Sequence, residues 1–235
     1  MDAVVMAGGL GTRLMPLTVS VPKPLLPLGD RPIIDVVLSQ LTAHGFDRVY
    51  LCIGHLAGLF REYLGSGERW KIDIRYVIEE SPQGTAGGLR QIPALSEDFM
   101  VINGDTLTDL DFSAFMRFHC EQEAGATLFT PWIENKIEYG VVTFDDSNGR
   151  VTGYDEKPSR GFYASSGIYA LASRMLRLLP SSGRFDMPDL IQAALTRGEK
   201  ILAYQCPAYW QDIGLISHYE KADREYQKDP KRFVR

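Results

Sequence analysis

The sequence predicts an α/β protein built around one largely parallel sheet with helices on both faces. In the first half of the chain, continuous apolar runs typical of buried strands alternate with helical patterns, as in parallel sheets covered on both sides. In the second half, shorter apolar runs are joined by turns such as residues 145–149, which indicates some antiparallel strands. No linker, repeat or low-complexity segment separates these halves. We therefore expect one domain over residues 1–226, followed by a charged, peripheral tail at residues 227–235.

The first half predicts four strands and four helices. The segment 33–43 shows the clearest helical period, because Ile34, Val37, Leu38 and Leu41 fall on one face. The expected strands are residues 3–7, 49–53, 72–78 and 99–102, and the expected helices are residues 33–43, 55–64, 85–92 and 112–121.

The second half predicts strands first and then helices. Runs rich in β-branched and aromatic residues, bounded by turn residues, favour strands, whereas apolar residues at helical spacing favour helices. The expected strands are residues 126–130, 140–144, 151–154 and 162–171, and the expected helices are residues 172–179, 188–196 and 215–227.

Composition narrows the class of protein. The 235 residues are 45% hydrophobic, which is enough for one sizeable core, and the net charge of -5 argues against nucleic-acid binding through a basic face. No apolar run approaches the roughly 18 residues of a membrane helix, and the N-terminus lacks the basic flank of a signal peptide. Three scattered cysteines suggest a reducing compartment. We expect a cytoplasmic protein without a membrane or nucleic-acid partner.

Residues 7–27 carry the strongest chemical signal. A glycine-rich loop with Gly8, Gly9 and Gly11 leads to Arg13, and Lys23 follows between two prolines. Backbone N–H groups of such loops form concavities that suit anions, and glycine permits close approach to a phosphate. Arginine and lysine add charge in two different geometries. The combination predicts a polyphosphate site rather than a simple strand-to-helix turn.

Two aspartates are candidates for Mg²⁺ binding. Asp105 follows the expected strand at residues 99–102, and ligand crevices of parallel sheets lie at this edge. Asp212 is flanked by apolar residues and would need a partner there. Magnesium prefers a few carboxylates together with phosphate oxygens. The alternatives are a turn aspartate at Asp105 and a helix N-cap at Asp212.

Further elements suggest a second phosphorylated substrate. Lys157 precedes a proline after an expected strand, as does Lys23, although a solvated loop lysine is the alternative. The glycine-containing segment 79–89 could pack against a flat ligand such as a base. No serine–histidine or cysteine–histidine pair stands out as a nucleophile, which favours direct in-line phosphoryl transfer.

The chain resembles the sugar-1-phosphate nucleotidyltransferases, also called NDP-sugar pyrophosphorylases. The resemblance covers residues 3–226 and is closest to the mannose-1-phosphate guanylyltransferase branch. It rests on motifs in the family's order, namely residues 7–14, 22–24, 84–87, 103–105, 139–142, 156–158, 167–169 and 210–214. It implies a Rossmann-like three-layer α/β fold with a mostly parallel mixed central sheet. It also implies Mg²⁺-dependent transfer of a nucleoside monophosphate from an NTP to a sugar 1-phosphate, with release of pyrophosphate.

The resemblance also assigns roles to individual residues. Arg13 would stabilise the departing pyrophosphate, Lys23 would neutralise the α-phosphate, and Asp105 and Asp212 would bind Mg²⁺. Lys157 would hold the sugar phosphate. The remaining expected contacts are to the nucleotide for Ala7, Gly8, Gly9, Gly11, Thr12, Glu79, Gly84 and Thr85, and to the sugar for Tyr139, Gly140, Glu156 and Gly167. Ser165 and Ser166 replace an asparagine and an alanine common in relatives, which leaves the sugar contacts open.

The sequence gives weaker indications of the nucleobase, the sugar and the oligomeric state. A carboxylate at Glu79 accepts hydrogen bonds only, which suits the adjacent N–H donors of guanine, unless the side chain faces solvent. We therefore expect GTP with mannose 1-phosphate or a related hexose or heptose 1-phosphate. UTP, dTTP or CTP with another acceptor is the first alternative, and a non-catalytic regulatory scaffold is the second. A homodimer is the candidate assembly.

Overall fold

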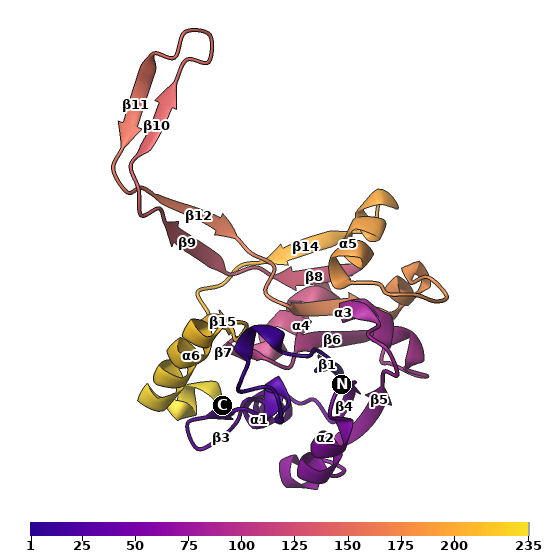
Figure 1. Ribbon diagram of the computed structural model, residues 1–235. Helices are drawn as coiled ribbons and strands as arrows, with labels where there is room; N and C mark the ends of the chain where they lie inside the picture. The colour runs from indigo at the N-terminus through magenta and orange to yellow at the C-terminus, as the bar shows by residue number, and fades with distance from the viewer. Residues whose placement is uncertain (235) are drawn as a thin grey trace.

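A computed structural model describes residues 1–234 of the chain (Figure 1). Seven strands form the central sheet, in the order β14–β8–β13–β6–β1–β4–β5. Of these seven, β13 runs antiparallel to both neighbours, and the other pairs are parallel. The bounds are β1 Asp2–Met6, β4 Arg48–Ile53, β5 Asp73–Ile78, β6 Asp98–Asn103, β8 Ala126–Phe129, β13 Ile168–Ala172 and β14 Ile201–Tyr204. The expected mostly parallel mixed sheet is confirmed.

Helices cover both faces of this sheet, which gives three layers. Successive strand residues point to opposite faces, so Val5 packs in one core cluster and Val4 in the other. The first face carries α1 (Ile33–Ala43), α2 (Ala57–Leu64) and α4 (Phe112–Glu121). The second face carries α3 (Gly84–Gly87), α5 (Met187–Thr196) and two 3-10 helices, Gly88–Gln91 and Ser173–Leu178. The expected three-layer Rossmann-like architecture is therefore present.

A third apolar cluster fastens the segment after β1 to the C-terminal helix α6 (Ile216–Lys228). Leu14 and Leu28 from that segment pack with Tyr226 of α6 and with Phe233. Phe233 is completely buried in the 3-10 helix Pro230–Phe233. The expectation of a peripheral tail is wrong for this part, because the apolar side chain of Phe233 completes the cluster.

Several elements differ from the sequence expectations. The single strand expected at residues 162–171 is two strands, β12 (Ser159–Tyr163) and β13. Between them the chain leaves a two-stranded antiparallel pair, which β12 forms with Trp132–Lys136, and enters the central sheet. The helices expected at residues 85–92 and 172–179 are largely 3-10 turns. Strands not expected are β2 Pro27–Leu28, β3 Arg31–Pro32, β7 Thr106–Thr108, β9 Trp132–Lys136, β14 and β15 Trp210–Asp212.

An arm projects from the body of the molecule (Figure 1). We define it as residues 132–163. Its base is the antiparallel pair β9–β12, and its outer part is the pair β10 (Val141–Phe144) and β11 (Val151–Asp155). Figure 1 shows β10–β11 standing clear of the sheet and its helices. Any residue on the outer pair is therefore far from the ends of the central strands.

Candidate active site

The glycine loop follows directly from β1. Gly11 has a φ of +63°, a left-handed conformation that favours glycine, and a Cβ there would lie 2.9 Å from Cγ2 of Thr18. The short 3-10 helix Thr12–Leu14 comes next. Leu14 is completely buried, so it anchors the turn and leaves the side chain of Arg13 on the exposed side.

Lys23 and Asp105 meet at the edge of the sheet. Lys23 opens a 3-10 helix between Pro22 and Pro24, and its ammonium contacts a carboxylate oxygen of Asp105, just beyond β6. Both side chains are mostly buried, with 12% and 20% of their surface exposed. The ion pair therefore fixes a cation and a carboxylate beneath the glycine loop, where both line a small cavity with Ala7, Gly9 and Gly11.

Asp212 joins this pair from a different element. It ends β15, which is antiparallel to β7, and the next residue, Ile213, donates its N–H to the carbonyl of Asp105 at 3.0 Å. A Cβ built on Gly214 would lie 2.5 Å from Oδ2 of Asp212 and 3.1 Å from Nη2 of Arg13. The guanidinium of Arg13 and the carboxylate of Asp212 thus flank the same glycine.

Four charged groups, Arg13, Lys23, Asp105 and Asp212, lie close enough together to act on one another electrostatically. Burial and the nearby charge of Asp105 raise the pKa of Asp212, and the charges of Lys23 and Arg13 act in the opposite direction. Two ionised carboxylates this close repel each other, so the ionised pair is unfavourable unless positive charge lies nearby. A divalent cation, or the positive side chains, would relieve that repulsion.

A first cavity of about 520 Å³ lies on one side of the glycine loop. Glu79, at the end of β5, lines it, and its Oε2 accepts a hydrogen bond from the N–H of Gln83 at 3.3 Å. A Cβ on Gly8 would lie 3.2 Å from the same oxygen. Burial raises the pKa of Glu79. The residues that line this cavity include Gly8, Gly9, Gly11, Thr12, Glu79, Gly84, Thr85 and Asp105.

A second cavity of about 550 Å³ adjoins the first and reaches Asp212. Gly167 lines it beside Asn103, whose N–H donates to the Gly167 carbonyl at 3.0 Å. Thr85, Asn103, Arg184 and Asp186 line both cavities. Two ligands bound in these cavities would therefore approach each other beside these four residues, with Asp105 in the lining of the first cavity and Asp212 in that of the second.

The segment 79–88 is clasped to the segment 180–187, and we call this set of contacts the clasp. The carbonyl of Phe185 accepts from the N–H groups of Ala86 and Gly87, both at 3.0 Å, and the side chain of Asp186 accepts from the N–H of Thr85 at 2.9 Å. Gly84, with a φ of +83°, passes so close that a Cβ would lie 2.5 Å from the Phe185 carbonyl oxygen.

Arg90 is the side chain at the centre of the clasp. Its guanidinium donates to Oε1 of Gln83 at 2.6 Å and to the carbonyls of Gly183 and Pro180 at 2.6 and 3.0 Å. Sequence inspection missed Arg90, Arg184 and Asp186. The pattern Asp186-Met187-Pro188-Asp189, typical of a helix start, would have placed Asp186 at a helix N-terminus, where site residues often lie.

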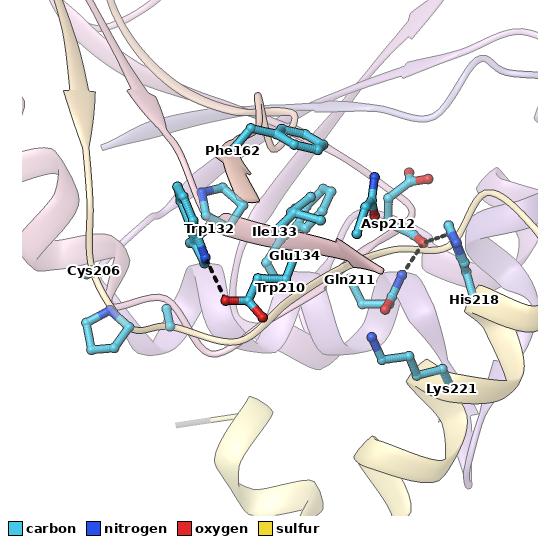
Figure 2. Close-up of a pocket in the computed structure, with 14 residues that line it drawn as sticks. Trp132, Ile133, Glu134, Phe162, Cys206, Trp210, Gln211, Asp212, His218 and Lys221 are labelled. Carbon is cyan, nitrogen blue, oxygen red and sulfur yellow. Dashed lines mark hydrogen bonds between the residues drawn. The ribbon is translucent and has the colours of Figure 1, made fainter. Parts of the chain in front are cut away.

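A third cavity, of about 660 Å³, lies between the base of the arm and α6. Figure 2 shows Trp132 and Phe162 of the arm on one side, with His218 and Lys221 on α6 on the other. Asp212 lines this cavity as well as the second one. The base of the arm therefore borders the site, although its outer part does not.

Residues 2–229 match the model of the family described as nucleotidyl transferase. The chain belongs to this family.

Individual nucleotidyl transferases resemble the chain over most of its length. A UTP–glucose-1-phosphate uridylyltransferase of Synechocystis is 32% identical over 244 residues, covering 95% of this chain and 63% of the relative. A mannose-1-phosphate guanylyltransferase of Mycobacterium tuberculosis is 32% identical over 219 residues, covering 91% and 61%. The crystal structure of HddC from Yersinia pseudotuberculosis is 25% identical with a TM-score of 0.75, covering 96% and 99%. The chain thus spans less than two thirds of both sequence relatives.

The structure brings most of the predicted site residues of this nucleotidyl transferase together. The connected cavities are lined by Ala7, the glycines of the loop, Thr12, Lys23, Glu79, Gly84, Thr85, Asp105, Gly167 and Asp212. Arg13 lies beside Asp212, across Gly214. Within residues 1–234, the helices are too short or too polar to span a lipid bilayer.

Four predicted residues of the nucleotidyl transferase lie elsewhere. Tyr139, Gly140, Glu156 and Lys157 lie where the base of the arm joins its outer pair, and they line none of the cavities described above. Tyr139 is 79% exposed, and Glu156 accepts a hydrogen bond from the hydroxyl of Tyr154 at 2.9 Å. The reason is the direction of the arm, which carries these residues away from the chain's own site.

Proposed function

We propose that the chain transfers a nucleoside monophosphate from an NTP to a sugar 1-phosphate, giving an NDP-sugar and pyrophosphate. The observation that supports this best is the convergence of Arg13, Lys23, Asp105 and Asp212, in which Asp105 lines the first of two adjoining cavities and Asp212 lines the second. A site for one ligand alone would not need the second cavity.

In the proposed reaction, a phosphate oxygen of the sugar phosphate attacks the α-phosphorus of the NTP. The bond from that phosphorus to the α–β bridging oxygen breaks, and pyrophosphate leaves. The attacking oxygen is already ionised, so no general base is required and catalysis comes from position and charge. Lys23 would neutralise the α-phosphate, Arg13 the leaving pyrophosphate, and loop N–H groups would hold the triphosphate.

The proposal includes Mg²⁺ held by Asp105 and Asp212. The residues fit this ion, because Asp105 lines the first cavity, Asp212 lines the adjoining one, and the two carboxylates repel each other when no cation separates them. When bound, the ion supplies positive charge to the triphosphate. Lys23 already neutralises part of the charge of Asp105, so the two carboxylates together carry less than two uncompensated charges.

For the base and the sugar, we propose guanine and mannose or a related hexose or heptose. Glu79 offers a half-buried carboxylate to the first cavity, which suits the N1–H and N2–H₂ donors of guanine. One relative named above is a guanylyltransferase and another is a UTP–glucose-1-phosphate uridylyltransferase, so UTP, dTTP or CTP with another acceptor is the alternative. The proposal also includes a cytoplasmic location, consistent with three free cysteines, and a homodimer.

A substrate matrix tests this function. GTP, UTP, dTTP and CTP are each combined with mannose, glucose and heptose 1-phosphates, with and without Mg²⁺, and pyrophosphate release is measured. We expect turnover that needs Mg²⁺ and is fastest with GTP. Absence of turnover with GTP on every acceptor would refute the base assignment.

A non-catalytic scaffold of the same fold is the second candidate function. It predicts no turnover for any pair in the matrix, although an NTP could still bind. Asp212→Ala separates the cases, since an enzyme of the proposed kind loses turnover and a scaffold has none to lose. The presence of Arg13, Lys23, Asp105 and Asp212 together in one site favours the enzyme over the scaffold.

A further inference from the structure

The third cavity, between the base of the arm and α6, has no part in the proposed reaction. Its volume of about 660 Å³ is that of a small-molecule site. It also meets the second cavity, because Trp210 and Asp212 line both. A ligand bound in the second cavity can therefore extend past Trp210 into the third.

Trp132 forms a fixed aromatic wall of the third cavity (Figure 2). Its indole lies so close over Gly161 that a Cβ added there would collide with the ring. The indole N–H donates to Oε1 of Glu134 at 3.4 Å, and the ring packs edge-on against Tyr163 with centroids 5.0 Å apart. These contacts hold the indole in place, although Trp132 is 54% exposed.

Trp210 forms a second wall, from the body of the molecule. Its indole N–H donates to the carbonyl of Ser166 at 2.9 Å, which fixes the plane of the ring. Phe162 of the arm adds a further aromatic ring to the same cavity. The face of an aromatic ring carries partial negative charge and attracts the polarised C–H bonds of a sugar ring. The walls of the third cavity therefore suit carbohydrate.

The polar groups of the third cavity suit hydroxyl groups better than phosphate. Asn135 and Gln211 contribute amides, and Gln211 is only 7% exposed. Amides both donate and accept hydrogen bonds, as hydroxyl groups do. Lys221 brings a positive charge, whereas Glu134 and Asp212 each bring a carboxylate. A phosphate group would meet more negative than positive charge there, so the expected occupant is neutral.

We propose that the third cavity binds a neutral, hydroxyl-rich group attached to the phosphorylated sugar of the acceptor, such as a second sugar ring. This inference rests on the proposed function for the acceptor's phosphate, and it names the acceptor class as glycosylated sugar 1-phosphates. The phosphate and the first ring lie in the second cavity beside Asp212, and the second ring lies against Trp132 and Trp210.

Titration calorimetry without NTP or Mg²⁺ tests the preference for the longer acceptor. Disaccharide 1-phosphates built on mannose and on glucose, each in several linkages, are compared with mannose 1-phosphate and glucose 1-phosphate. We expect at least one disaccharide 1-phosphate to bind about tenfold more tightly than the matching monosaccharide, the gain from one stacked aromatic contact. Equal or weaker binding for every linkage overturns the proposal.

Replacing the aromatic wall should remove that gain. In Trp132→Ala, we expect the ratio of disaccharide to monosaccharide affinity to fall from about ten to about one. Phe144→Ala removes an exposed ring on the outer part of the arm that lines none of the described cavities, so this matched control should keep the ratio. Phe162→Leu is a milder change in the wall, and thermal melting checks the fold of all three. A ratio unchanged in both Trp132→Ala and Phe162→Leu overturns the proposal.

Methyl glycosides of the same disaccharides separate this inference from the proposed function, because they carry no phosphate. We expect saturation-transfer NMR to detect their binding to the wild type and a weaker signal with Trp132→Ala. Turnover of hexose 1-phosphates with no preference for glycosylated ones overturns the inference and leaves the proposed function standing. Absence of turnover with every acceptor refutes the proposed function, and glycoside binding then still decides whether the cavity takes carbohydrate. Guanosine that binds at Trp132 in place of the glycosides would assign the cavity to a nucleobase and overturn the inference.

Discussion

The ammonium of Lys23 contacts the carboxylate of Asp105, and this ion pair ties the loop after β1 to the end of β6. Prolines on both sides of Lys23 restrict the backbone that carries it. The pair is largely shielded from water, so its geometry is set before any ligand arrives. A positioned cation of this kind stabilises charge that develops on a phosphate.

Replacing Lys23 should therefore damage the chemical step more than folding. We expect Lys23→Ala to lower kcat/KM roughly 10²–10³-fold, the effect of removing one charge-stabilising donor. Pyrophosphate release measures the rate, and thermal melting checks the fold. Lys71→Ala, at an exposed position outside the described cavities, is the control. A loss of less than tenfold at Lys23 would contradict the assigned role.

Asp212→Asn should stabilise the metal-free protein while abolishing turnover. Since the folded-state pKa of Asp212 is raised, mainly by burial and also by Asp105, the ionised carboxylate opposes folding as the pH rises above its ordinary pKa. In EDTA at pH 7, we expect Tm to rise by roughly 2–4 °C, with a smaller difference in acid. Adding Mg²⁺ should raise the Tm of the wild type and not of the variant. A lower Tm for the variant in EDTA would contradict this account.

Glu79→Gln should weaken GTP selectively. Losing hydrogen bonds to a charged acceptor predicts a KM for GTP that is about 10- to 100-fold higher. Since the raised pKa of Glu79 brings its protonation above the ordinary 4.5, GTP affinity of the wild type should fall as the pH drops from neutral into mild acid. That fall should be absent in Glu79→Gln. The exposed neighbour provides the control variant, Glu80→Gln. Equal effects of Glu79→Gln and Glu80→Gln on the KM for GTP would show that the base does not bind at Glu79.

Arg90→Ala should loosen the clasp and affect both substrates. The loss of three charged-donor hydrogen bonds predicts a KM about tenfold higher for the NTP and for the sugar phosphate, with kcat little changed. Hydrogen exchange should increase at residues 79–88 and 180–187 together. Arg174→Ala, whose partners Glu199 and Glu123 lie outside the clasp, serves as the comparison. An increase in exchange at one segment alone would show that Arg90 does not join them.

The sequence predicted the parts of the fold that local patterns determine. The strands before the glycine loop and before Asp105 were predicted because apolar runs end in glycine and polar residues, and α1 because its period was regular. The meeting of the glycine loop and Asp105 at one edge followed from the rule that ligands lie at the carboxyl ends of parallel strands. The shared site of Lys23 and Asp212 was expected only from the resemblance.

Other features depend on contacts that no local pattern specifies. β15 and β7 are three residues long, and their pairing brings Asp212 to Asp105. The clasp is made mostly by backbone groups, so Phe185 participates through its carbonyl and not through its side chain. The projection of the arm away from the body was also missed, because the residue pattern of its strands predicts a two-stranded ribbon but not the direction in which that ribbon points. That direction separates Lys157 from the site within one chain.

The clasp has a consequence for altering this protein's choice of ligands. Both segments line both cavities, residues 79–88 through Thr85 and residues 180–187 through Arg184 and Asp186, and shared hydrogen bonds hold the two segments as one piece. A segment transplanted from a relative would arrive without its matching half and would leave backbone donors unsatisfied. Transplants that change preference for one ligand must therefore carry both segments, and they will alter preference for the other ligand as well.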